Sequence, residues 1–131
     1  MKMMKNGMTS PNLVGIDYST TSPAICVRVN DKWDIHFLTD KKQLADEYWH
    51  DPFLFYGQTL PKIQVKISRY KYISSWALDV IQSYDTAAVF IEDYAYAAHG
   101  RVFNIGENTG ILKYRLLHND IPFYEIPPTV I

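Results

Sequence analysis

A helical pattern followed at once by a short apolar strand constrains the fold of this chain more than any other feature. Apolar side chains recur with the period of an α-helix at Ile73, Ala77, Val80, Ile81 and Tyr84. We expect this helix to begin near Val65 or Ser68. The run 87–92 is continuously apolar up to its terminal acid, which is typical of a strand buried on both faces of a parallel sheet. A helix that leads into such a strand indicates an α/β fold.

Three further strands are predicted upstream of this helix. Residues 12–18 follow a proline and are apolar except for one acid, which predicts a buried strand. Residues 23–29 and 33–38 are β-rich and are separated by the turn-type cluster 30–32, so we expect a hairpin and three antiparallel strands in all. Between residues 39 and 61 the pattern loses its period and contains Pro and Gly, which predicts an ordered loop or a short helix.

A second helix and a closing strand complete the predicted order. Residues 103–119 carry Ile105, Leu112 and Leu116 on one helical stripe, and residues 122–126 form a short strand before two prolines. Right-handed crossovers make the last strands parallel, whereas the opening hairpin is antiparallel, so the sheet is mixed. This pattern resembles the ribonuclease H-like fold, with five strands in the order 3-2-1-4-5.

Length and composition limit the class of protein. The chain has 131 residues, 47% of them apolar and 21% charged, which fits one globular domain rather than a disordered or fibrous protein. We assign residues 1–11 to a polar, mobile tail and residues 12–131 to the domain. No apolar run is long enough to span a bilayer, and the tail lacks the apolar stretch of a secretory signal, so we expect no membrane partner and a cytoplasmic location.

Charge and cysteine content add two further expectations. The net charge of −1 argues against non-specific binding of polyanions as the whole function, because such binding needs a surplus of Lys and Arg. A local basic face remains possible. The single cysteine, Cys26, has apolar neighbours and no internal disulfide partner, so we expect it to be a small buried hydrophobic residue.

Two carboxylates are the main candidates for chemistry. Asp17 lies in a buried strand, where an acid is costly unless it is paired, protonated or bound to a metal, although it could also cap the turn that follows. Glu92 ends the strand 87–92 and could instead be a solvated strand end; Asp93 alternates to the other face and is the weaker choice. If the two strands are parallel neighbours, Asp17 and Glu92 meet at their carboxyl ends and offer hard oxygen ligands for Mg²⁺ or Mn²⁺.

The order and spacing of several motifs resemble the RuvC family of Holliday-junction resolvases, especially its phage-encoded members. The segment 15–25, Gly-Ile-Asp followed by a Ser/Thr turn and a second strand, is similar to the first motif of that family. The apolar strand 89–92 that ends in Glu is similar to the second motif. The segments 100–103 and 105–112 resemble the loop and Gly-containing helix that follow, and 121–130 resembles the closing strand with its Pro-x-x-Val.

The resemblance implies a two-ion site and in-line hydrolysis of a phosphodiester in branched DNA, with Asp17 and Glu92 as catalytic metal ligands. The family supplies its third and fourth acids from the helix after the last strand, where this sequence stops at Ile131. We therefore expect a C-terminally incomplete domain, although the site could be completed differently or the protein could lack cleavage. Glu107 and Glu125 are possible substitute ligands.

Basic and aromatic residues near these acids are candidates for DNA contact. Lys62, Lys66, Arg69 and Lys71 cluster at the start of the first helix, and Arg101 and His99 follow Glu92. Ser19 and Thr20 could steady the turn beside Asp17 or contact a phosphate. Tyr94, Tyr96 and Phe103 could stack on unpaired bases or pack in the core.

Subunit organisation and competing functions follow from the same residues. Gly106 and Gly110 lie within the second helix, where they suggest close approach by the sheet or by a second subunit. Because a four-way junction has two-fold symmetry, we expect a homodimer. The alternatives are a non-catalytic nucleic-acid or protein binding module on the same fold, and an ATP-handling fragment, since residues 15–21 also resemble the first phosphate motif of the actin, sugar-kinase and heat-shock chaperone superfamily.

Overall fold

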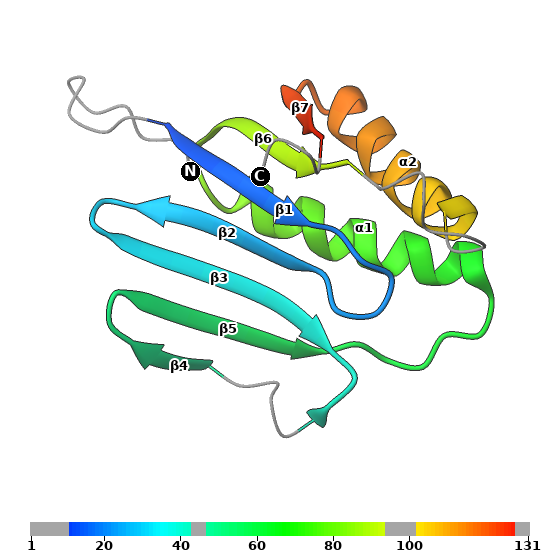
Figure 1. The fold of residues 1–131 in the computed structure, drawn as a ribbon, viewed down its shortest axis with the longest axis horizontal. Helices are drawn as coiled ribbons and strands as arrows, with labels where there is room; N and C mark the ends of the chain where they lie inside the picture. Colours follow the sequence, from blue (N-terminus) through cyan, green and yellow to red (C-terminus); the bar gives the residue numbers. More distant parts are fainter. Residues whose placement is uncertain (1–10, 43–46, 94–101, 128–131) are drawn as a thin grey trace.

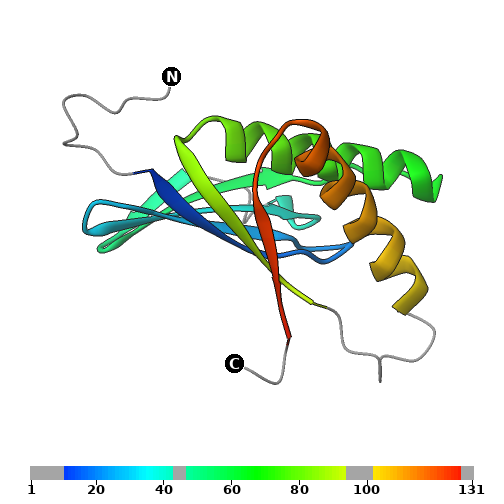
Figure 2. The same ribbon diagram turned by 90° about the horizontal axis from the view of Figure 1, so that it is seen from above.

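The computed structural model describes residues 11–42, 47–93 and 102–127, and in it two helices cover one face of a seven-stranded mixed sheet (Figures 1 and 2). The elements are β1 (Asn12–Asp17), β2 (Ala24–Val29), β3 (Lys32–Thr39), β4 (Glu47–His50), β5 (Phe53–Thr59), α1 (Lys66–Gln82), β6 (Thr86–Glu92), α2 (Val102–His118) and β7 (Phe123–Ile126). Neither helix has the length and apolar character that crossing a membrane requires, in the part of the chain that is described.

The sheet has the order β4-β5-β3-β2-β1-β6-β7. Antiparallel pairing of β1 with β2 and of β2 with β3 confirms the predicted opening strands, and parallel pairing of β1 with β6 and of β6 with β7 confirms the predicted crossovers. The five predicted strands form a contiguous run in the predicted order, but the prediction of a five-stranded sheet is wrong in strand count and in the complete order. Two further strands, β5 and β4, extend the sheet beyond β3.

The loop or short helix expected over residues 39–61 is therefore wrong, because β4 and β5 lie within that stretch. In β5 the run Phe53–Tyr56 is apolar or aromatic at every position and is half-buried on both faces of the sheet. Such a run lacks the alternation of polar and apolar residues that marks a strand with one solvated face. Pro52 and Gly57, which the sequence analysis read as breakers, lie just before β5 and within it.

The core lies between the sheet and the two helices. The apolar face predicted for the first helix is confirmed, since Ile73, Ala77 and Ile81 of α1 are fully buried. Leu112 and Leu116 of α2 are also fully buried. They pack in one cluster with alternate residues of the central strands, namely Val14, Ile16, Ile25, Val27, Val89 and Ile91. Alternation along each strand therefore sends the intervening residues to the opposite face.

No described helix covers that opposite face, which we call the open face (Figure 2). Leu13 is 56% exposed there, and Phe90 stacks on Tyr124 with ring centroids 5.5 Å apart. Cys26 is half-buried rather than buried, because its strand places it on the open face opposite Gly15. A hollow of about 730 Å³ lies over this region, with Gly15 and Cys26 among its lining residues.

Replacement of Ile73 by Ala tests how far the core depends on α1. Ile73 is 0% exposed, so Ile73→Ala should lower the free energy of unfolding by about 2–5 kcal/mol through lost burial and a residual cavity. Ile67 lies on the same helix but is 58% exposed, so Ile67→Ala should change stability by less than about 0.5 kcal/mol. Urea denaturation measures both, and equal losses would contradict the packing described here.

Candidate active site

The register of β1 and β6 brings the two candidate carboxylates together. The parallel pairing runs in step to Ile16 opposite Ile91, and Asp17 and Glu92 are the next residues of the two strands. Ile16 and Ile91 are buried beneath the helices, so Asp17 and Glu92 lie on the open face, and both are exposed. Hydrogen-bonded strands lie about 4.8 Å apart, so the two carboxylates are neighbours at the carboxyl edge of the sheet.

Asp17 occupies a different environment from the one expected. It ends β1 and is exposed, so the argument that a buried acid needs a partner does not apply to it. Its position beside Glu92 is what makes it a candidate ligand. Asp93 lies just past β6, half-buried, and its backbone N–H donates to the carbonyl oxygen of Ile126 at 2.8 Å.

The residues present fit part of a divalent-cation site. Two adjacent carboxylates supply the hard oxygen ligands that Mg²⁺ and Mn²⁺ prefer. Within residues 11–42, 47–93 and 102–127, however, no group of three or more His, Cys, Asp or Glu side chains is placed to hold a metal. The described residues therefore provide two ligands, where a two-ion site needs more.

The two possible substitute ligands, Glu107 and Glu125, lie apart from Asp17 and Glu92. Glu125 is registered opposite Ile91 on the helix side of the sheet, where its Oε1 lies 2.5 Å from Nζ of Lys113. Glu107 is exposed on α2, and its charge acts on Tyr70 of α1: burial, together with Glu107, raises the pKa of the Tyr70 phenol. Neither carboxylate is grouped with Asp17 and Glu92.

The turn after Asp17 is held by its own backbone and by both helices. Ser19 Oγ accepts hydrogen bonds from the N–H groups of Ser22 at 2.8 Å and Thr21 at 3.3 Å, which is the turn-stabilising role considered above. From α1, Arg69 Nε donates to the carbonyl oxygen of Thr20 at 2.9 Å. These contacts fix the backbone beside the carboxylate pair.

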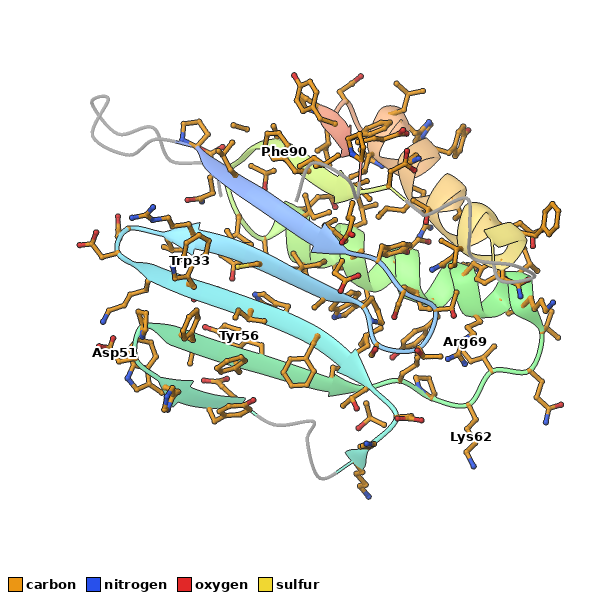
Figure 3. The ribbon with its side chains drawn as sticks, viewed as in Figure 1. Trp33, Asp51, Tyr56, Lys62, Arg69 and Phe90 are labelled. Atoms are coloured by element: carbon orange, nitrogen blue, oxygen red, sulfur yellow. The ribbon has the colours of Figure 1, made fainter. Side chains whose placement is uncertain are left out.

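Most of the predicted DNA-contacting cations lie at the same end of the sheet. Lys62 precedes α1, and Lys66 and Arg69 lie in its first turn. Figure 3 shows Arg69 beside the turn that follows β1 and Lys62 on the segment that leads into α1. Lys62, Lys66 and Lys71 are exposed, and Lys66 Nζ donates to Oδ1 of Asn104 at 3.2 Å. Arg101, His99, Tyr94 and Tyr96 lie outside the described residues. Phe103 of α2 is 76% exposed and is not a core residue.

Asn108 is a residue near the site that the sequence analysis missed. It is fully buried, its Nδ2 donates to the carbonyl oxygen of Ser19 at 3.4 Å, and its Oδ1 has no hydrogen-bond partner among the described atoms. It thus connects α2 to the turn after Asp17. A polar residue three positions after Ile105 and four before Leu112, on the apolar stripe of the helix, was the signal that could have revealed it.

Comparison with known proteins identifies the fold. No family of known proteins and no curated protein matches this sequence. The structure is similar to T. thermophilus RuvC in complex with Holliday junction substrate, with a TM-score of 0.63 and 14% identity over 92% of this chain and 66% of that chain. It is also similar to another Thermus thermophilus RuvC structure, with a TM-score of 0.59 and 16% identity over 89% of this chain and 64% of that one.

These comparisons establish a RuvC-like, ribonuclease H-like fold, as the motifs predicted. At this level of identity they show the fold alone. The chain spans about two thirds of the length of the RuvC chains that it matches.

Replacement of Ser19 tests the turn beside the carboxylate pair. Ser19→Ala removes the acceptor of two backbone N–H groups and should lower the free energy of unfolding by about 1 kcal/mol. Ser22→Ala is the matched control, because Ser22 is exposed and contributes only a backbone N–H that Ala retains. Thermal or urea unfolding compares them, and equal stabilities for the two variants would contradict this account of the turn.

Proposed function

We propose that this protein is a metal-dependent endonuclease that hydrolyses phosphodiester bonds in branched DNA, as a Holliday-junction resolvase does. The observation that carries the proposal is the pair of exposed carboxylates, Asp17 and Glu92, on adjacent parallel strand ends of a RuvC-like fold. A structural neighbour with this fold is RuvC bound to a Holliday junction. Such a function would place the protein in DNA recombination or repair, in a bacterial cytoplasm or in the host cytoplasm if a phage encodes it.

In this proposal the residues of the site have separate roles. Asp17 and Glu92 hold one or both of two Mg²⁺ or Mn²⁺ ions and do not act as acid and base. The ions, when bound, supply an activated water and neutralise the charge on the leaving oxygen. Ser19 and Arg69 keep the backbone after Asp17 in place, so the orientation of that carboxylate is fixed before DNA binds. The phosphates of the DNA are contacted by five basic side chains, those of Lys62, Lys66, Arg69, Lys71 and Arg101.

The remaining ligands of the site come, in this proposal, from outside the described residues. The family resemblance assigns them to a helix after the last strand. The register of β7 supports this, because Ile126 lies opposite Glu92 and the chain leaves the sheet at the edge that bears the carboxylate pair. The open face, which no described helix covers, gives such a segment a place to pack.

Replacement of Asp17 tests the nuclease directly. In the complete gene product, Asp17→Asn should lower Mg²⁺-dependent cleavage of a synthetic four-way junction by more than about 100-fold, since even the outer-shell partners of metal ligands are worth about 10- to 100-fold. Asp31→Asn is the matched control, because Asp31 is exposed in the β2–β3 turn at the other end of β1. Cleavage that survives Asp17→Asn would refute the assignment.

One observation favours a second candidate function, a binding module that does not cleave. Among the described residues no third acid joins Asp17 and Glu92, and two carboxylates alone make a poor two-ion site. The cleavage assay separates the two candidates. Affinity of the complete gene product for branched DNA, without Mg²⁺-dependent cutting, would select the binding module.

We also propose that the protein acts as a homodimer through α2. Phe103, Gly110, Tyr114 and Leu117 fall on one face of the helix, and the three large side chains are 76%, 66% and 68% exposed. A Cβ atom at Gly110 would have no neighbour within 4 Å, so the sheet does not require this glycine. An exposed apolar stripe that includes a glycine, which has no side chain, allows close approach by the same helix of a second copy.

A double replacement on this stripe tests the dimer. Tyr114→Asp with Leu117→Asp should convert a dimer to a monomer without loss of fold, because two charges would be buried unpaired in the interface. Ile67→Asp, at an exposed apolar residue of α1, should leave the dimer intact. Sedimentation equilibrium at micromolar concentration measures both. A wild-type monomer, or a dimer that persists in the double variant, would exclude α2 as the interface.

A further inference from the structure

A second cavity lies on the helix side of the sheet, away from Asp17 and Glu92. It has a volume of about 370 Å³ and lies between one flank of α1 and the strands β3 and β5. The flank of α1 contributes Tyr72, Trp76 and Asp79, and the strands contribute His36 and Gln58. Aromatic and apolar surface makes up most of its lining, with a few polar groups among it, as is typical of small-molecule sites.

The cavity exists because the sheet is wider than the helical layer. Strands β5 and β4 continue the sheet past β3, and α1 and α2 pack over the central strands (Figure 1). Side chains on the helix side of β5 therefore lie beside α1 rather than under it. Tyr56 is one of them (Figure 3), and its ring stacks on that of His36 with centroids 4.5 Å apart and an interplanar angle of 14°.

Hydrogen bonds among Tyr84, Asp34 and His36 hold the His36 ring in place beside the cavity. The hydroxyl of Tyr84 donates to Oδ2 of Asp34 at 2.7 Å, and it lies 2.6 Å from Nε2 of His36. Because the hydroxyl proton is directed to Asp34, Nε2 of His36 is the donor to the Tyr84 oxygen. The other ring nitrogen of His36, Nδ1, is then the acceptor atom of the neutral imidazole. His36 is one of the residues that line the cavity.

Among the described residues, the only carboxylate that lines the cavity is that of Asp79, which is exposed. Asp34 does not line it but accepts the hydrogen bond from Tyr84. Burial and the hydrogen bond to Asp34 raise the pKa of Tyr84, and burial followed by Asp34 raises that of Tyr56, with no Lys or Arg acting on either phenol. Arg115 Nη1 donates to Oγ of the lining residue Ser75 at 2.7 Å, although Arg115 itself does not line the cavity.

We propose that this cavity binds an organic cation, either a guanidinium or an alkylammonium group. Asp79 supplies the opposite charge, and Gln58 and the ring of His36 supply hydrogen-bond acceptors. The rings of Trp76 and Tyr72 supply the aromatic surface on which cations are stabilised. The site is independent of the proposed nuclease, because it lies on the other face of the sheet from Asp17 and Glu92.

The test is titration of the ¹⁵N-labelled protein with agmatine and with the peptide acetyl-Gly-Arg-Gly-amide, followed by NMR. Both cations should shift the Trp76 indole and the Gln58 side-chain amide and leave the indoles of Trp33 and Trp49 unchanged. Asp79→Asn should weaken binding about tenfold, as expected for loss of one charge-assisted hydrogen bond. Asp31→Asn, at an exposed turn, is the matched control and should bind as the wild type does.

Each outcome either tests whether the cavity binds a cation or distinguishes a partner protein from a free small molecule as the source of that cation. Binding of the peptide as tight as that of agmatine supports a side chain presented by a partner protein, and binding of agmatine alone supports a free small cation. Absence of shifts at Trp76 and Gln58, or equal affinity of Asp79→Asn and wild type, overturns the site. Shifts at these residues with inorganic phosphate instead of the two cations overturn it as well.

Discussion

The in-step pairing of β1 with β6 is the interaction on which the rest of this structure depends. It joins the antiparallel half of the sheet to the parallel half, and it sets which residues of both strands face the helices. Because Val14, Ile16, Val89 and Ile91 are buried together, the register cannot shift by one residue without exposing the two buried residues of the strand that moves. The same constraint puts Asp17 and Glu92 side by side, so the packing of the core determines the geometry of the site.

The helices give the two faces of the sheet different roles. On the covered face, apolar side chains and the contacts of Arg69 and Asn108 connect α1 and α2 to the turn after Asp17. On the open face, the carboxylate pair lies at one edge of an apolar surface that no described element covers. A nuclease site needs such access for DNA. The proposed origin of the missing ligands, a segment that packs on this surface, follows from the same asymmetry.

The β4–β5 hairpin has consequences at a distance from the carboxylates. It widens the sheet beyond the strands that α1 covers, and a cavity lies between β5 and the flank of α1. The aromatic stack of His36 on Tyr56 depends on this extra strand, because Tyr56 lies in β5. The cavity and the carboxylate pair therefore lie on opposite faces of one sheet.

Local patterning alone determined the helices and the central strands, because helical period and continuous apolar runs report burial directly. It also predicted Asp17 and Glu92 as candidate ligands, although Asp17 is exposed rather than buried. The sequence did not reveal β4, which is exposed at every position, or β5, which is half-buried on both faces, because neither strand alternates buried and exposed residues. Asn108, the pairing of Glu125 with Lys113, and the joint placement of Asp17 and Glu92 were decided by tertiary structure. Each depends on which distant segments become neighbours, and that is set by packing of the whole sheet against its helices rather than by any local run of residues.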